Sequence, residues 1–193
     1  MSRGLSTYLV DLRKLKRSCG GSSSKLGPAL EAKFATRIED LERRNRANGR
    51  PAVRQALKKL VSGQRLQRTH APVAAGVLEL VASHCGSFLP NHAWYPCDTR
   101  FIRGLDRAMR SAEISVSISE LLFNGSPIAI PLPSSGCPAV GHLDARAAAA
   151  LRRQLRGRSV ADVDPRQAAA LRQFTGWLDR AAQTRMGLVF FYY

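Results

Sequence analysis

Cysteine and histidine are the residues of this sequence with the clearest capacity for chemistry. Zinc binds four nitrogen or sulfur ligands in tetrahedral geometry, and these two side chains are its usual ligands. The candidates are Cys85, Cys97, Cys137 and His142, with His84 or His92 in addition. Their spacing contains no local ligand pair of a standard zinc site. Buried thiols and scattered loop histidines are the alternative, and we predict no metal and no other cofactor.

A nucleophilic role is a second chemistry that these residue types allow. Cys137 lies five positions before His142, so one loop could place a thiol beside a base. His142 and Asp144 could also act as a base with its orienting carboxylate. The spacing identifies no third group for the Cys–His pair. Asp144 is well placed to cap the following helix, with His142 in the preceding turn. We therefore predict no catalytic residue, and an enzyme based on Cys137 and His142 is the third function considered.

Positive charge is concentrated in the first third of the chain. Residues 1–70 contain 17 lysines and arginines against 5 acidic residues, within a total of 30 against 14 and a net charge of +16. Such a surface suits phosphate groups, whose contacts give salt-dependent affinity without sequence preference. The candidate polyanion-binding residues are Arg43, Arg44, Arg46, Arg50, Arg54, Lys58, Arg65 and Arg68. No aromatic residue lies between residues 43 and 68, so base stacking is not expected there. The alternative is a solvated helix surface in a protein from a GC-rich genome.

Apolar periodicity predicts that helices must position these side chains. One helix is expected over residues 28–46, with Leu30, Phe34, Ile38 and Leu41 on one face. A second helix begins after Pro51 and buries an apolar stripe. That stripe consists of Val53, Ala56, Leu57, Leu60 and Val61.

A central helix is predicted over residues 72–85, which are apolar nearly all round. Glu79 is the one charged residue in this segment. Shorter helices are expected over residues 100–109 and 117–123. Another follows Asp144, and a last helix begins at Pro165.

Both ends of the chain are expected to form strands. Tyr8 and Val10 suit a pleated surface, and residues 188–193 form an apolar run that must be buried. Pairing the two segments would make a small sheet under the helices. Ile128–Ile130 is a third, short strand candidate, whereas residues 86–99 and 131–141 are expected to be loops.

The predicted fold is a single α+β domain over residues 1–193, predominantly helical, with a small sheet that pairs the N-terminal and C-terminal strands. Its parts are a basic helical front over residues 1–70, the core helix at about 72–85, and the C-terminal helices and terminal strand over 144–193.

Two aromatic residues are candidates for binding a partner. Trp94 and Tyr95 lie in the proline-containing loop, and exposed aromatic side chains often anchor interfaces. The alternative is that Trp94 fills the core.

Several segments together resemble a family of uncharacterised bacterial proteins that is common in actinomycetes and other GC-rich bacteria. The segments are Tyr8-Leu-Val-Asp11-Leu, Glu120-Leu-Leu-Phe123-x-Gly125-Ser-Pro127, Gly141-His142-Leu143, Trp177-Leu178 and Gly187-Leu-Val-Phe-Phe-Tyr. The resemblance spans most of the chain and keeps the order of the segments. It implies no activity, because none is assigned to the family.

These observations favour a non-catalytic binding module whose partner is another protein. Binding of nucleic acid or another polyanion by the basic residues is the alternative. No apolar run approaches the roughly 20 residues that cross a bilayer, and the start of the chain lacks a signal-peptide pattern. We therefore expect a cytoplasmic protein with reduced cysteines and no membrane partner.

Overall fold

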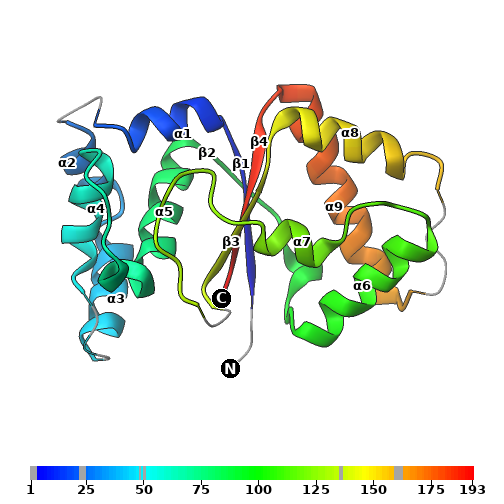
Figure 1. The fold of residues 1–193 in the computed structure, drawn as a ribbon, viewed down its shortest axis with the longest axis horizontal. Coiled ribbons are helices and arrows are strands. Elements are labelled where there is room, and N and C mark those ends of the chain that lie inside the picture. Colours follow the sequence, from blue (N-terminus) through cyan, green and yellow to red (C-terminus); the bar gives the residue numbers. More distant parts are fainter. Residues whose placement is uncertain (1–3, 22–24, 48, 50, 135–136, 159–162) are drawn as a thin grey trace.

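A four-stranded antiparallel sheet separates two layers of helices (Figure 1). The computed structural model of the chain describes residues 4–21, 25–47, 49, 51–134, 137–158 and 163–193. The strands are β1 (Leu5–Val10), β2 (Gly86–Leu89), β3 (Ala139–Leu143) and β4 (Gly187–Tyr192), in the spatial order β2-β1-β4-β3. The two terminal strands are therefore the central ones.

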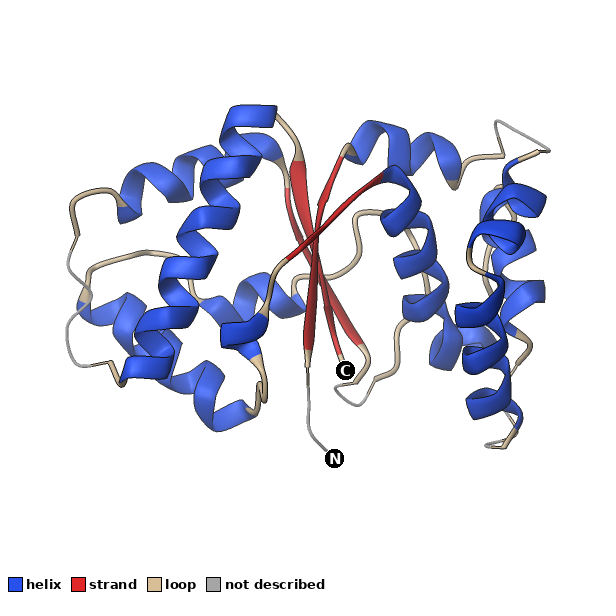
Figure 2. Ribbon diagram, turned by 180° about the vertical axis from the view of Figure 1, so that it is seen from behind, coloured by secondary structure: helices blue, strands red, loops and turns tan. Residues whose placement is uncertain are grey.

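Helices lie on both sides of the sheet (Figure 2), and chain order determines which of them cover which face. The N-terminal layer contains α1 (Leu12–Ser18), α2 (Leu26–Lys33), α3 (Ala35–Arg46), α4 (Val53–Val61) and α5 (Ala71–Cys85). The C-terminal layer contains α6 (Thr99–Ser111), α7 (Ile118–Phe123), α8 (Ala145–Leu155) and α9 (Pro165–Thr184). Two short 3-10 turns are η1 (Arg68–His70) and η2 (His92–Trp94).

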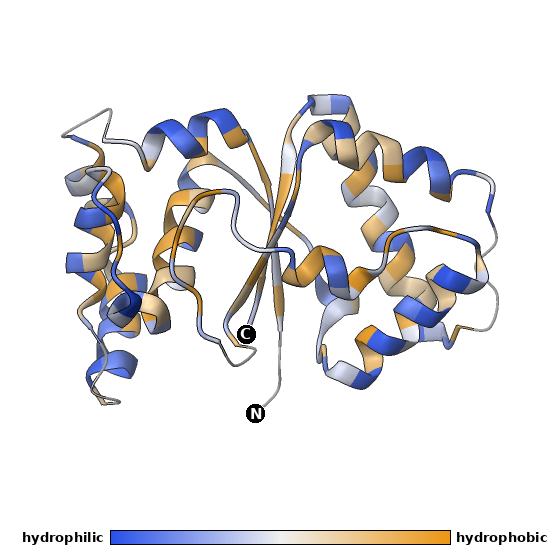
Figure 3. Ribbon diagram, viewed as in Figure 1, coloured by the Kyte–Doolittle hydropathy of each residue, from blue (hydrophilic) through white to orange (hydrophobic). Residues whose placement is uncertain are grey.

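The predicted pairing of the terminal strands is confirmed. β1 and β4 are antiparallel, with Leu5 opposite Tyr192 and Val10 opposite Gly187. Side chains alternate between the faces of a strand, so Val189 packs in the N-terminal layer and Phe190 in the C-terminal layer. Both faces are covered, which explains why every residue of β4 is buried and why its middle residues, 188–191, are strongly apolar (Figure 3). The predicted α+β fold class is correct.

Four helices follow the local signals of the sequence closely, two by their apolar periodicity and two by their first residues. The five apolar residues expected on the inner face of α4 are all buried. α5 is buried on nearly every side, as predicted for a central helix. Asp144 caps α8 by accepting a hydrogen bond from the N–H of Ala147 at 2.7 Å, and Pro165 opens α9.

The prediction of a single helix over residues 28–46 is wrong, because the helix is interrupted at Phe34. The backbone of Phe34, at φ −116° and ψ 25°, leaves the helical region between α2 and α3. Neither glycine nor proline marks this position, so the break has no local signal. The bend allows α2 and α3 to contact α4 separately while Leu30 and Ile38 both remain buried.

Two strands lie where the sequence indicated loops or turns. β2 occupies the start of the expected loop over residues 86–99, and β3 replaces the predicted strand at Ile128–Ile130. His142 lies within β3 and not in a turn before α8. Both segments are short and contain glycine, so their strand character comes from pairing with β1 and β4. Within the described part of the chain, no helix has both the length and the apolarity to cross a membrane.

Candidate functional site

The structure divides the predicted polyanion-binding residues between separate surfaces. Arg43, Arg46 and Arg54 border a groove of about 850 Å³ between α3 and α4. Glu39 and Glu42 line the same groove, so its charge is mixed. Cations at the end of α3 also complement the negative end of that helix. This groove is a poor surface for phosphate, because acidic side chains lie among the basic ones.

Ion pairs reduce the positive charge of this region further. Arg54 lies 3.5 Å from Glu31, and its backbone N–H donates to Glu42 at 2.9 Å. Arg43 lies 3.2 Å from Asp40, one helical turn earlier. Surface pairs of this kind contribute little stability, but they place carboxylates beside the guanidinium groups.

The remaining members of the predicted set lie elsewhere. Arg65 and Arg68 line a second groove, of about 630 Å³, against residues 129–131. Arg44 and Lys58 are exposed on α3 and α4. Arg50 lies outside the described residues. The described members of the predicted set therefore line more than one groove.

The candidate zinc ligands do not converge. Among the described residues, no group of three or more His, Cys, Asp or Glu side chains is arranged to hold a metal ion. Cys85 belongs to the N-terminal layer and Cys97 to the C-terminal layer, so the sheet lies between them. Burial raises the pKa of the Cys97 thiol to about 12, which keeps it protonated at neutral pH. These thiols act as small apolar side chains.

His142 and Asp144 have separate roles. His142 Nδ1 lies 2.9 Å from the carbonyl oxygen of Gly125, so this nitrogen carries the proton and donates. Asp144 accepts the capping bond from Ala147. The histidine and the carboxylate therefore do not form a base with its orienting group.

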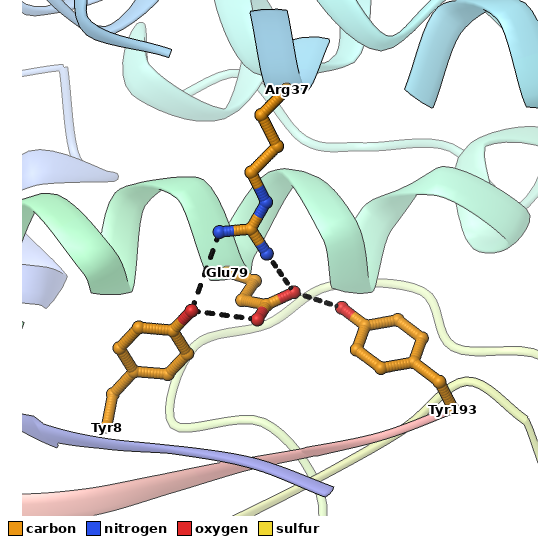
Figure 4. Close-up of polar contacts among 4 residues, drawn as sticks. All are labelled: Tyr8, Arg37, Glu79 and Tyr193. Carbon is orange, nitrogen blue, oxygen red and sulfur yellow. Dashed lines mark hydrogen bonds and ion pairs between the residues drawn. The ribbon is translucent and has the colours of Figure 1, made fainter. Parts of the chain in front are cut away.

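A polar cluster around a buried carboxylate connects three elements of the N-terminal half with the last residue of the chain (Figure 4). Glu79, in the middle of α5, is only 3% exposed. Its carboxylate accepts hydrogen bonds from the hydroxyls of Tyr8 at 2.9 Å and Tyr193 at 2.5 Å. Arg37 of α3 lies 2.6 Å from the same carboxylate. The cluster satisfies a charge that would otherwise be costly to bury.

The electrostatics of this cluster favour a structural role over proton transfer. Burial and the nearby Glu79 charge raise the pKa of Tyr8 to about 12, and the same causes raise the pKa of Tyr193 well above its usual value. Burial disfavours the charged form of Arg37, but the Glu79 carboxylate raises the pKa of this guanidinium overall. Both tyrosines therefore remain donors at neutral pH, and the cluster attaches α3 and α5 to the sheet.

The β3 edge of the sheet is covered. The side chain of Asn124 pairs with the backbone of His142 as a neighbouring strand would, donating to its carbonyl and accepting from its N–H, both at 2.8 Å. Gly125 donates its N–H to the carbonyl of Val140 at 3.0 Å. A side chain at Gly141 would clash with the backbone of α7, which shows how closely this helix packs on the strand.

The opposite edge of the sheet is formed by β2. Gly4 and Tyr193 exchange two backbone hydrogen bonds, of 3.2 and 3.0 Å. In antiparallel pairs, hydrogen-bonded and non-bonded residue pairs alternate. The backbone groups of Thr7 and Leu9 are therefore directed away from β4 and towards β2.

This alternation determines the direction of the backbone groups of β2. Leu89 is opposite Thr7 and Ser87 is opposite Leu9, so these two residues bond to β1. Phe88, between them, directs its N–H and C=O outwards. The strand Gly-Ser-Phe-Leu contains no charged residue and no proline, which are common protections of an exposed edge.

Two exposed aromatic side chains accompany this edge. Phe88 is 51% exposed and contacts Tyr8 at a ring-centroid distance of 5.6 Å. Tyr95 is 60% exposed and lies near Gly4. Trp94 is buried, as the core alternative predicts, and stacks on Trp177 at 5.4 Å. We therefore define the β2-edge surface as residues 86–89 together with Tyr95.

Sequence reasoning found only part of these features. Tyr95 was a candidate, but Phe88 and the Glu79 cluster were not. A lone charge in an otherwise apolar helix was the available signal for Glu79, because a buried carboxylate needs a partner. Nothing local distinguishes β2 from a loop.

Comparison with known proteins identifies a family but no activity. Residues 1–193 match a family described as a domain of unknown function, DUF7691. The chain belongs to this family. The match covers every segment on which the resemblance was based. No curated protein and no solved structure shows significant similarity to the DUF7691 chain.

Proposed function

We propose that this DUF7691 protein is a non-catalytic binding module that pairs β2 with an extended segment of another protein. The observation that carries the proposal is the difference between the two sheet edges. A helix and an asparagine side chain cover β3, whereas Phe88 directs its backbone groups and half of its side chain to solvent. Addition of a strand to an open edge is a common mode of peptide recognition.

The chemistry of this edge indicates what the partner segment contains. Phe88 and Tyr95 offer apolar contact to side chains of the added strand, and aromatic residues are frequent anchors of interfaces. Arg37 is partly exposed, and its guanidinium lies 3.5 Å from the hydroxyl of Tyr8. The ring of Tyr8 in turn contacts Phe88. The net charge of +16 favours association with an acidic partner. We therefore expect an extended, apolar segment that carries acidic residues.

The length of β2 limits the strength of this interaction. Within its four residues, only Gly86 and Phe88 direct their backbone groups outwards. A few main-chain hydrogen bonds and two aromatic contacts are consistent with micromolar binding, not with a permanent complex.

The composition supports a host and a location for the protein. Arginine outnumbers lysine by 24 to 6, which is typical of GC-rich bacterial genomes. The described cysteines are free thiols, as in a reducing compartment. We include a cytoplasmic location in such a bacterium in the proposal.

Three variants test the proposal in affinity purification from the host. Phe88→Pro removes the outward N–H without affecting a bond to β1, whereas Phe88→Ala retains the N–H and removes the ring. We expect Phe88→Pro to abolish capture of the partner and Phe88→Ala to weaken it about tenfold. Ser87→Ala is the matched control, because its backbone is directed towards β1. Equal capture by Phe88→Pro and the unmodified chain would exclude strand addition, provided that both unfold at the same temperature.

Polyanion binding remains the alternative function. It can be tested by measuring the affinity for a mixed-sequence oligonucleotide at salt concentrations from 50 to 200 mM. If several side chains contact phosphates, the affinity should fall about 10³-fold over this range. Arg54→Ala combined with Lys58→Ala should flatten this salt dependence if the predicted residues bind phosphate. The carboxylates in the α3–α4 groove lead us to expect weak binding at most.

A further inference from the structure

A crevice lies at the end of the sheet where β1 and β3 both finish. Each of these strands is antiparallel to β4, which lies between them, so β1 and β3 run in the same direction. β1 ends at Val10, opposite Gly187, and β3 ends at Leu143, opposite Leu188, so both strands finish at the beginning of β4. The chain turns into a helix directly after each of the two parallel strands.

The two helices diverge to opposite faces of the sheet (Figure 1). Leu15 of α1 is buried in the N-terminal layer, and Leu151 of α8 is buried in the C-terminal layer. Their separation leaves a crevice of about 680 Å³ above the beginning of β4. In open, mostly parallel α/β sheets, ligands bind where neighbouring connections leave the strand ends in opposite directions. The crevice here resembles such a point, although the antiparallel β4 separates the two parallel strands.

Basic side chains surround this crevice. It is lined by Arg13 and Lys16 of α1, Arg146 of α8, and Arg185 between α9 and β4, all of which are exposed. None of them belongs to the polyanion set predicted from the sequence. Because they come from three separate parts of the chain, only the fold brings them together.

The two acidic residues of the crevice are already engaged as helix caps. Asp11 accepts from the N–H groups of Arg13 and Lys14 at 2.9 and 3.0 Å, and Asp144 accepts from Ala147 at 2.7 Å. The bond from Lys14 is the main reason that the pKa of Asp11 is lowered. Four cations against two capping carboxylates leave the crevice with an excess of two positive charges. The helix ends themselves are capped, so a ligand would be held by the basic side chains.

Arg185 occupies a backbone conformation that favours glycine. Its φ of 55° and ψ of 31° are left-handed, and its N–H closes the end of α9 by donating to Ala181. Glycine usually takes this position after a helix. An arginine here costs conformational energy and places a guanidinium at the rim of the crevice.

We propose that this crevice binds a small molecule that carries a phosphate or diphosphate group. The anionic group would lie among Arg13, Arg146 and Arg185, which can donate several hydrogen bonds to phosphate oxygens. The remainder of the ligand would contact the apolar wall of Leu12, Ala145 and Met186. The volume suits a ligand of nucleotide size. This inference does not depend on the function proposed for the β2-edge surface.

Calorimetric titration of the full chain with pyrophosphate and with ADP tests the proposal. We expect saturable binding of one equivalent of each, tighter for ADP because its nucleoside can contact the apolar wall. Arg146→Ala and Arg185→Gly should each weaken binding about tenfold, the loss typical of one charge-assisted contact. Arg185→Gly is the most informative variant, because glycine relieves the left-handed backbone and the melting temperature should not fall. Lost affinity in an equally stable protein cannot arise from unfolding.

Matched variants and competing ligands define the outcomes that would overturn the proposal. Arg110→Ala removes an exposed arginine at the end of α6 and should leave pyrophosphate affinity unchanged. Phe88→Pro should also leave it unchanged, which separates this site from the β2-edge surface. The proposal fails if neither ligand binds saturably at 150 mM salt, or if Arg185→Gly and Arg146→Ala bind as the unmodified chain does. It also fails if an oligonucleotide displaces ADP but binds both variants unchanged, which would indicate a surface for nucleic acid.

Discussion

The two faces of the sheet are attached to their helices by different chemistry. On the N-terminal face, a buried carboxylate from α5 is held by two tyrosine hydroxyls and an arginine. In the C-terminal layer, four aromatic rings of η2, α6 and α9 form one cluster, in which Trp94 lies within 6.3 Å of each of the other three. Charge-assisted hydrogen bonds are directional, whereas burial of apolar rings is not. The N-terminal layer therefore adds a dependence on complete polar partners and on pH to its apolar core, whereas the C-terminal layer depends on packed volume.

The difference extends to the edges of the sheet. α7 of the C-terminal layer covers β3 together with Asn124, but no comparable element of the described chain pairs with the outer edge of β2. The protein thus protects one edge and leaves available the edge proposed to bind a partner. Four perturbations separate these regions, in decreasing order of expected effect.

The largest effect is expected from Glu79→Ala. This change leaves Arg37 and two tyrosine hydroxyls without their buried acceptor. An unsatisfied buried donor costs about 1–3 kcal/mol, and Arg37 is partly exposed to solvent, so we expect a total loss of about 3 kcal/mol. Urea denaturation monitored by circular dichroism measures the free energy of unfolding. Glu79→Gln retains the shape and one acceptor and should cost less than Glu79→Ala. A loss below about 1 kcal/mol for Glu79→Ala would show that the cluster is not the main attachment of this face.

Alkaline pH should weaken the N-terminal face selectively. The pKa of Tyr8 is raised from 10.0 to about 12, so the unfolded chain loses this proton first as the pH rises. The stability contributed by protonated Tyr8 is complete below pH 10 and is lost between about pH 10 and 12. A difference of two pKa units between the folded and unfolded chain corresponds to about 2–3 kcal/mol of unfolding free energy. Tyr193, whose pKa is also raised, contributes in the same direction.

Unfolding free energies measured at intervals from pH 9 to 12 test this dependence. Tyr8→Phe should lose less stability across that interval than the unmodified chain, although it is less stable at pH 9. Trp94→Phe, on the other face, should retain the full dependence. If the unfolding free energies of Tyr8→Phe and Trp94→Phe fell equally steeply with pH, the pH dependence could not be assigned to the N-terminal face.

Two tryptophans of the C-terminal face should differ in their sensitivity to replacement by phenylalanine. Trp177 Nε1 donates to the carbonyl of Pro90 at 3.0 Å, whereas the buried Trp94 Nε1 has no hydrogen-bond partner among the described residues. Trp177→Phe therefore loses a hydrogen bond as well as volume and should cost about 1–2 kcal/mol. Trp94→Phe removes an unsatisfied donor, which offsets part of the lost packing. Thermal unfolding should rank the two in that order, and the reverse order would contradict the assignment of the hydrogen bond.

The smallest effect is expected at the covered edge. Asn124→Ala removes two partly exposed hydrogen bonds to His142 and should cost about 1 kcal/mol. Hydrogen exchange of the His142 amide should become faster, while exchange within β4 stays slow. Asn124→Asp retains an acceptor for the His142 N–H and serves as the matched variant. Unchanged exchange at His142 in Asn124→Ala would mean that α7 alone protects this edge.

Much of the fold can be predicted from local patterns in the sequence. The buried stripe of α4 and the all-round burial of α5 follow from apolar spacing, and Asp144 was identified as a helix cap from its position. The apolar run over residues 188–193 indicated that this segment pairs with β1, because an exposed strand of this kind would aggregate. These features depend on residues that are neighbours in sequence or on the general cost of exposing apolar surface.

The candidate sites could not be predicted in the same way. The excess of lysine and arginine over acidic residues identified the basic front over residues 1–70. In the structure, carboxylates pair with some of these arginines or lie between them. The β2-edge surface depends on which strands become central, and residues from three parts of the chain form the basic crevice. In each case the decisive neighbours are far apart in sequence.

Helix caps and apolar periodicity act over a few residues, so the fold class, most helices and the central strand pair can be predicted without coordinates. The break at Phe34, the strand character of β2 and β3, and the partners of Glu79 depend on long-range packing. Tyr8 and Glu79 are 71 positions apart, and Glu79 and Tyr193 are 114 apart. Contacts over such separations leave no periodic signal, since their free energy arises only when packing brings the groups out of water together.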